Sequence, residues 1–252
     1  MSLSPLVSII TVVFNGEKHL QQTIDSVYNQ TYKNIEYIII DGNSTDRTLE
    51  IIKENEHKIH NWISENDDGL YDAMNKGIRM SRGELIGIIN SDDWYERDAV
   101  QLVVDAYINN LDKKVFHGDR YDIDEKGDKS LYRFNSSRTK FLYFSMTYNH
   151  PSMFFHRSVY QEVLYNTNLR VYSDYELVLT VYLKNKKLFH YINKPYVNYR
   201  LDGLSSKQTI IKNVKEGTRA RLNAGLKKHK ILIFVLAKTS FLAFKKIVKS
   251  VM

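Results

Sequence analysis

The 252-residue chain contains no cysteine. A disulfide framework, a thiolate metal site and a cysteine nucleophile are therefore excluded, and such a composition is typical of proteins from a reducing cytosol. The N-terminal residues lead directly into an apolar run, without the basic segment and small-residue cleavage site of a secretory signal peptide. We therefore expect a cytoplasmic protein.

Two phosphate-binding motifs are absent as well. No GxGxxG follows the first apolar run, and neither GxxxxGKS nor GxxxxGKT occurs in the chain. A Rossmann-type dinucleotide site and a Walker-type ATPase site are thus not expected.

Acidic residues are missing from 225–252, a segment that carries seven lysines. Because the net charge of the whole chain is +7, this segment accounts for the entire basic excess and the rest is neutral. A nucleic-acid-binding domain would carry a basic face on the fold itself, so we expect no nucleic-acid partner.

The same segment lacks an apolar run of the roughly 20 residues that a spanning helix needs. On a helix its lysines would occupy one arc and apolar residues most of the remainder. This pattern favours a tail, 206–252, that lies peripherally on the inner face of the cell membrane. The alternatives are that the tail packs on the rest of the chain or in a homodimer interface.

Short β-branched runs alternate with amphipathic segments in the first 115 residues. This alternation predicts a mostly parallel central sheet flanked by helices, an α/β fold with right-handed crossovers. The expected strands are 6–14, 35–40, 60–64 and 85–89, and the expected helices are near 20–28, 49–52, 70–80 and 98–108.

The alternation stops after about residue 115. Residues 116–205 read as a mixed second half that shares the same sheet. We expect strands at 115–119, 152–156, 188–191 and 196–200, a hairpin over 121–134, and helices at 158–165 and 175–184.

Polar clusters follow three of the expected parallel strands: Asn15, residues 41–46 and residues 90–93. Each cluster taken alone is better explained as turn and helix-cap chemistry. Because ligands of open α/β sheets bind at the carboxyl ends of the strands, the three together predict one site.

Four segments in order carry a specific resemblance: VSIITVVFN, IIIDGNSTDRT, SENDDGLYDAMNKGI and GELIGIINSDDW. They resemble glycosyltransferase family 2, whose fold is GT-A, and in particular bacterial members that build surface polysaccharides. The resemblance covers roughly residues 1–115 and implies that this half binds a nucleotide diphosphate sugar.

The resemblance assigns roles to six residues of the nucleotide site. Asp41 and Asp67 would contact the base, Val12 and Phe14 would line its pocket, and Asn75 and Lys76 would lie beside the nucleotide. Val12 is a departure, because many members have proline there.

Asn90-Ser91-Asp92 stands at the family's DxD position. Asn90 replaces the first aspartate and would approach ribose or phosphate beside Ser91. Asp92 would hold Mn²⁺ or Mg²⁺, with Asp93 as a further candidate, and the metal would bridge the diphosphate.

The second half must supply a general base that is ionised near neutral pH. Asp174 resembles the family's catalytic acidic position, although it would also serve as a helix cap. His150 would touch the diphosphate or the acceptor, Arg200 would neutralise phosphate, and Asp119 would face the acceptor. A packed or merely polar histidine is the alternative for His150, and a surface ion pair is the alternative for Arg200.

These features predict a metal-dependent, inverting glycosyltransferase that moves a sugar, most simply from a UDP-sugar, to a hydroxyl of a growing or lipid-linked glycan. The alternatives are a sugar nucleotidyltransferase and a non-catalytic carbohydrate-binding or scaffolding protein. The nucleotidyltransferase would want a Gly-rich, basic loop after the first strand, and residues 15–18 supply one poorly.

Overall fold

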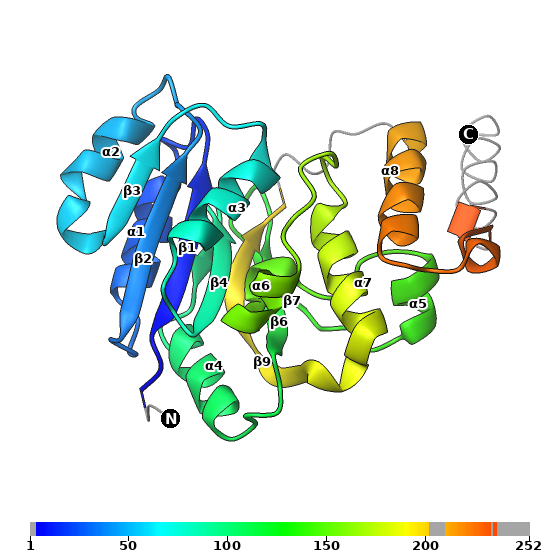
Figure 1. The fold of residues 1–252 in the computed structure, drawn as a ribbon. Coiled ribbons are helices and arrows are strands. Elements are labelled where there is room, and N and C mark those ends of the chain that lie inside the picture. The colour runs from blue at the N-terminus through cyan, green and yellow to red at the C-terminus, as the bar shows by residue number, and fades with distance from the viewer. Residues whose placement is uncertain (1–3, 202–209, 233, 236–252) are drawn as a thin grey trace.

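The computed structural model describes residues 4–201, 210–232 and 234–235, and Figure 1 shows one central sheet with helices packed around it. Within these residues the strands follow the order β3-β2-β1-β4-β8-β6-β9-β5, with β7 attached to β6. The strands are β1 (Val7–Val13), β2 (Ile35–Asp41), β3 (Asn61–Ser64), β4 (Leu85–Asn90), β5 (Trp94–Tyr95), β6 (Val115–Ile123), β7 (Lys129–Tyr132), β8 (Phe154–His156) and β9 (Phe189–Arg200).

The first four strands in this order are parallel, which confirms the predicted α/β half. Val12 on β1 is level with Ile40 on β2 and with Asn90 on β4, so these strands end at one edge. The chain moves outward from β1 through β2 to β3 and then returns to β4 on the other side of β1. This reversal creates the kind of crevice in which α/β proteins bind ligands.

The second half closes the sheet with mixed pairings. β8 runs antiparallel between β4 and β6, whereas β9 runs parallel to β6. Two predicted strands, 188–191 and 196–200, are one strand, and the predicted strand 115–119 continues into the first arm of the hairpin. The β6–β9 register shifts on both sides of Asp119, which is level with Pro195, so this irregularity accommodates the proline that suggested a break.

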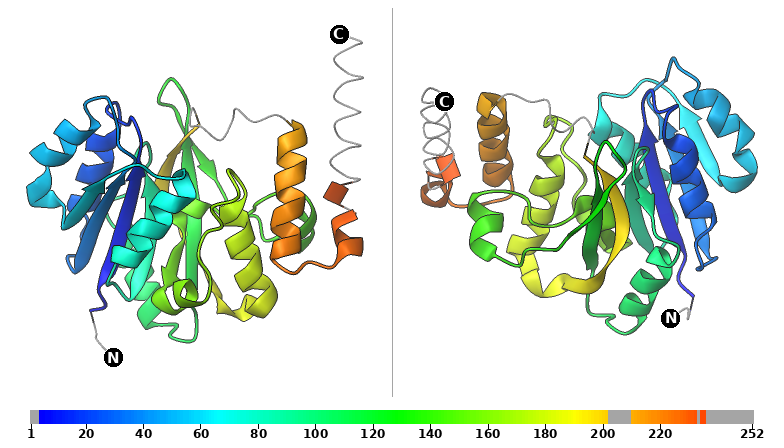
Figure 2. Two further views of the ribbon diagram at one scale, coloured as in Figure 1. Left: turned by 45° about the horizontal axis from the view of Figure 1, so that its top comes forward. Right: turned by 180° about the vertical axis from the view of Figure 1, so that it is seen from behind.

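Helices cover both faces of the sheet. One core joins alternate strand residues such as Ile10 and Val12 to α3 and α7, and a second joins Val7, Ile9 and Val13 to α1 and α4. The view from behind in Figure 2 shows the blue α1 in front of β1. The helices are α1 (Leu20–Tyr28), α2 (Thr48–Glu54), α3 (Leu70–Met80), α4 (Ala99–Ile108), α5 (Arg138–Tyr143), α6 (Arg157–Glu162), α7 (Ser173–Asn185) and α8 (Ile210–Asn223), with short 3₁₀ turns η1 (Glu56–Lys58), η2 (His150–Ser152) and η3 (Lys186–Leu188).

The first part of the predicted tail packs on the protein. Helix α8 lies beside α7 (Figure 1), and its buried Arg221 stacks on the rings of Tyr175 and Phe234 at 4.5 and 3.7 Å. The Arg221 guanidinium also donates hydrogen bonds to the Leu142 and Gly217 carbonyl oxygens. The predictions for residues 236–252 lie outside the described residues. Within the described part of the chain, no helix combines the length and apolarity that crossing a membrane would require.

Candidate active site

The loops that follow β1 and β2 are tied together by side-chain hydrogen bonds. The backbone N–H of Asn15 donates to Ser44 Oγ at 2.8 Å, and Asn15 Oδ1 accepts from the Thr45 N–H at 2.9 Å. The Gly16 N–H donates to Thr48 Oγ1. Asn15 takes a positive φ of 51°, which an asparagine tolerates in such a turn. Two of the three predicted polar clusters therefore form one rigid rim.

Asp41 ends β2 and is fully buried beneath this rim. Its carboxylate accepts hydrogen bonds from the Ser44 N–H and hydroxyl and from the Ser64 hydroxyl at 2.6 Å. A carboxylate has about four acceptor positions, so these contacts fix Asp41 without exhausting it.

The side chains of Phe14 and Asp67 both approach Gly42. A Cβ atom added to Gly42 would come within 2.6 Å of Asp67 Oδ2 and 3.5 Å of Phe14 Cδ2. The Phe14 ring is 62% exposed, whereas Val12 is only 3% exposed and belongs to the core below. An exposed ring beside a carboxylate forms a slot suited to a planar group with N–H donors.

Asn75 and Lys76 brace the segments beside this slot. The Asn75 amide exchanges hydrogen bonds with the backbone N–H and carbonyl of Tyr165, at 3.0 and 2.8 Å. The Lys76 ammonium donates to the Asn66 carbonyl and pairs with Glu65 at 2.9 Å. Desolvation opposes the charge of Lys76, but the carboxylates of Glu65 and Asp72 together outweigh it and raise the lysine pKa.

Thr23 of α1 holds the turn that follows β4. Its hydroxyl lies 2.9 Å from the Ser91 carbonyl oxygen and 2.7 Å from that of Asp93. The Ser91 hydroxyl faces Gly16, where an added Cβ would lie 3.1 Å away. The third polar cluster thereby joins the other two at the same sheet edge.

The two aspartates of this turn differ in environment. Asp93 is 1% exposed, accepts from the Arg200 N–H at 3.0 Å, and has its pKa raised by burial and by the neighbouring charge of Asp92. Asp92 is partly exposed. Asp93 therefore serves to join β4 to β9, which leaves Asp92 as the carboxylate at the surface of the site.

The donor atoms of this turn fit a hard divalent cation. Asn90 Oδ1 is buried and has no hydrogen-bond partner among the described residues. It lies two residues from the Asp92 carboxylate, so the available ligands are oxygens. Such a set suits Mn²⁺ or Mg²⁺ completed by phosphate and water.

Arg200 brings positive charge to the same turn. Its guanidinium lies over the Trp94 ring at 4.7 Å and donates to Gln22 Oε1 at 2.7 Å. Its Nε is buried and lacks a partner within the part of the chain that the structure describes. The side chain is therefore held in place with a donor unused.

Asp174 lies in the first turn of α7. Its Oδ1 accepts from the Tyr175 N–H at 2.7 Å and from the Tyr71 hydroxyl at 3.2 Å. Burial raises the pKa of this carboxyl group, and the nearby His150 opposes the rise. The carboxylate is a stronger proton acceptor than an exposed aspartate would be.

Tyr71 and Tyr165 connect Asp174 to His150. The two tyrosine rings stack with centroids 5.6 Å apart, and His150 Nε2 lies 2.8 Å from the Tyr165 hydroxyl. Burial lowers the pKa of His150, and the nearby Asp174 opposes this shift. The sequence predicted a role for neither tyrosine: Tyr71 lies in one of the four segments that resemble the family but received no role there, and nothing near Tyr165 distinguishes it from the other tyrosines of the chain.

Two further features involve Tyr71 and Asp119. A cavity of about 350 Å³ opens between residues 68–71 and residues 167–170, with Tyr71 in its wall. Asp119, predicted to face the acceptor, is buried and accepts from the Phe134 N–H and the Tyr191 hydroxyl at 2.7 and 2.8 Å. Asp119 therefore links Phe134 to Tyr191 of β9 and stabilises the second half of the fold.

Comparison with known structures shows that this architecture is the GT-A fold. The chain superimposes on TarS 1–349 of S. aureus, solved in complex with UDP-GlcNAc, with a TM-score of 0.69 and 19% sequence identity. The superposition covers 92% of this chain and 72% of that chain. A mannosyltransferase from Pyrobaculum calidifontis, in complex with GDP-Man and Mn²⁺, gives a TM-score of 0.60 at 14% identity, covering 97% of this chain and 80% of that chain.

Sequence comparison identifies the family to which the chain belongs. The chain is 33% identical over 206 residues to a chondroitin synthase of Escherichia coli, covering 79% of this chain and 29% of the synthase. It is 28% identical over 233 residues to the glycosyltransferase GlyA of Streptococcus pneumoniae, covering 80% of this chain and 31% of GlyA. The chain thus spans about a third of the length of these relatives. The family model for glycosyl transferase family 2 matches residues 8–164, and the chain belongs to that family.

Proposed function

We propose that the protein transfers a sugar from a nucleotide diphosphate sugar, most simply a UDP-sugar, to a hydroxyl group of a growing bacterial glycan. The observation that carries this proposal is the convergence of three features at one sheet edge. These are the slot between Phe14 and Asp67, the oxygen atoms of Asn90 and Asp92, and the partly exposed Asp174, which Tyr71 at the start of α3 contacts. The neighbour TarS, which binds UDP-GlcNAc, supports the choice of donor.

The nucleotide would enter at the carboxyl ends of β1, β2 and β4. Phe14 would stack on the base, Asp67 and Asp41 would accept from its N–H groups, and Arg200 would face the diphosphate. Asn75 and Lys76 would act indirectly, by holding the segments that flank the slot. Ser91 would lie beside the ribose or phosphate.

Replacing Phe14 with alanine is expected to weaken UDP binding by about 1–3 kcal/mol, roughly 5- to 150-fold, because base stacking on the exposed ring is lost. Stability should change by less than about 0.5 kcal/mol, since the ring is mostly in solvent. Calorimetric titration of UDP and thermal unfolding measure the two quantities. Leu70→Ala, another exposed apolar residue, is the control, and equal affinity losses in both variants would contradict the stacking role.

The transfer would be a single displacement with inversion. Asp174 accepts the acceptor hydroxyl proton, the hydroxyl oxygen bonds to C1 of the donor sugar, and the bond from C1 to the diphosphate oxygen breaks. Asp92 and Asn90 would hold Mn²⁺ or Mg²⁺, which when bound supplies charge stabilisation for the leaving diphosphate. The cavity beside Tyr71 would admit the acceptor.

Tyr71→Phe is expected to move the acidic limb of the turnover profile to higher pH. The Tyr71 hydroxyl donates to Asp174 and so favours its ionised form. Its removal therefore raises the pKa of Asp174 further, and a higher pH is needed to form the active carboxylate. Tyr160→Phe is the control, because that hydroxyl contacts Tyr165 and not Asp174. If both variants show the wild-type limb, Tyr71 does not act on Asp174.

A donor panel tests the proposed function directly. Release of nucleoside diphosphate from UDP- and GDP-sugars, followed with Mn²⁺ and with a glycan acceptor mixture, should identify one donor. Release of pyrophosphate from a nucleoside triphosphate and a sugar phosphate would instead identify a nucleotidyltransferase, and sugar binding without turnover would identify a binding protein.

A lipid-linked glycan acceptor would bring the protein to the inner face of the cell membrane. Lys227, Lys228 and Leu232 are exposed in the part of the tail that follows α8. Cationic and apolar side chains exposed in one segment support such a peripheral contact.

A further inference from the structure

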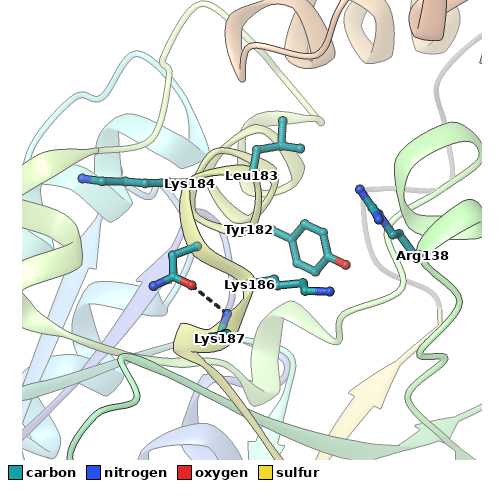
Figure 3. Close-up of a pocket in the computed structure, with 7 residues that line it drawn as sticks. Arg138, Tyr182, Leu183, Lys184, Lys186 and Lys187 are labelled. Carbon is teal, nitrogen blue, oxygen red and sulfur yellow. Dashed lines mark hydrogen bonds between the residues drawn. The ribbon is translucent and has the colours of Figure 1, made fainter.

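A second cavity, of about 300 Å³, lies at the far end of α7 from Asp174 (Figure 3). Its charged and aromatic lining residues are Arg138, Tyr182, Lys184, Lys186 and Lys187, and no aspartate or glutamate among the described residues lines it. Because a helix rises about 1.5 Å per residue, Lys186 lies roughly 18 Å along the α7 axis from Asp174. The cavity is therefore separate from the site of transfer.

The positive charge of this cavity is largely uncompensated. Lys184 pairs with Glu162. Arg138, Lys186 and Lys187 are exposed, and none of them forms an ion pair with another described residue. Three cations thus surround a concave surface whose wall, as far as the structure describes the chain, contains no acidic partner.

Helix electrostatics explain only part of this arrangement. Lys184 and Lys186 at the end of α7 complement the negative end of the helix macrodipole. Arg138 does the opposite, because it is the first residue of α5, which has no acidic residue in its first turn. A cation at that position is unfavourable for α5, so its place beside the α7 lysines calls for another reason.

An aromatic wall completes the cavity. The half-buried Tyr182 ring is fixed edge-on against Phe141 and Phe189, with centroids 5.2 and 5.8 Å apart. Figure 3 shows its hydroxyl on the side that faces Arg138, with Lys186 below. A fixed ring with a polar end offers an apolar face to a sugar ring and a hydrogen-bonding group at its edge.

We propose that this cavity binds an anionic sugar unit of the acceptor glycan, one that carries a carboxylate, sulfate or phosphate group. The inference rests on the proposed function, because it assigns the cavity to the acceptor of that reaction. Arg138 supplies the fork that recognises such oxyanions, and Lys186 and Lys187 supply point charges. An extended glycan held here would run along α7 toward Asp174.

The test is calorimetric titration with oligogalacturonate, dextran sulfate and mannose 6-phosphate, with uncharged dextran for comparison. Wild-type protein should bind at least one anionic probe and bind dextran more weakly. The exposed pair Lys186→Glu/Lys187→Glu and the single Arg138→Glu should each weaken that binding about tenfold or more.

The matched control is Lys33→Glu/Lys53→Glu, which changes the net charge equally at exposed positions near α1 and α2. Affinity for the anionic probe should be unchanged in this control, and UDP affinity should be unchanged in every variant. Equal weakening in the control, or no binding of any anionic probe by the wild type, would overturn the proposal. If the wild-type protein does not bind UDP at all, that result would instead contradict the proposed function.

Discussion

Asp174→Asn is expected to lower turnover by about 10²- to 10⁴-fold, the usual contribution of a general base. The amide oxygen of asparagine can still accept from the Tyr175 N–H and the Tyr71 hydroxyl. It cannot take up the acceptor proton at neutral pH. Because burial raises the pKa of Asp174, the folded protein holds the charged form at a cost, and the neutral variant should fold at least as stably above about pH 4.

The measurement is turnover of the donor identified by the panel, together with UDP affinity, which should stay within about twofold. Glu176→Gln is the control, since Glu176 lies in the same turn of α7 but accepts hydrogen bonds from Asn166 and Asn223. Similar turnover losses in both variants would mean that Asp174 acts only as part of the helix terminus.

Phe154→Ala is expected to lower the free energy of unfolding by about 3–5 kcal/mol. Phe154 is 0% exposed on β8, the strand that joins the two halves of the sheet. Its ring covers Gly87 of β4 so closely that an added Cβ would lie 2.6 Å from the ring, and it packs on Tyr95 at 5.7 Å. The alanine variant would leave a cavity where the halves meet.

Thermal unfolding measures this effect. At about 2–4 °C per kcal/mol for a chain of this size, the melting temperature should fall by roughly 6–20 °C. Leu131→Ala removes an apolar side chain that is 46% exposed on β7, and it should change stability by no more than about 0.5 kcal/mol. A Phe154→Ala variant as stable as this control would show that β8 is not a structural joint.

The parallel half of the fold was predictable because its strands are continuous β-branched runs that end in turn residues. Parallel registry then carries the three polar clusters to one edge, as with Val12 opposite Ile40 and Asn90. In the second half, β9 continues through Asn193-Lys194-Pro195. The register shifts that allow this depend on β6, a neighbour distant in sequence.

The surroundings of the site were less predictable than its motifs. Tyr71 and Asp174 are 103 positions apart in the sequence, and Asn75 and Tyr165 are 90 positions apart. Because of this separation, no local sequence pattern predicts either contact. Arg221 illustrates the same limit. It looks like an ordinary surface arginine in sequence, yet Tyr175 and Phe234 enclose it at the point where the tail packs on α7.

The most direct test of a metal-assisted nucleotide site is calorimetric titration of UDP with and without Mn²⁺, on the wild type and on Asp92→Ala. We expect Mn²⁺ to tighten UDP binding at least about tenfold in the wild type, since metal and diphosphate share ligands. In Asp92→Ala the metal should have no effect, whereas the exposed control Asp98→Ala should behave as the wild type. The account would be contradicted if Mn²⁺ did not change the UDP affinity of the wild type, or if it changed the UDP affinity of Asp92→Ala by the same factor.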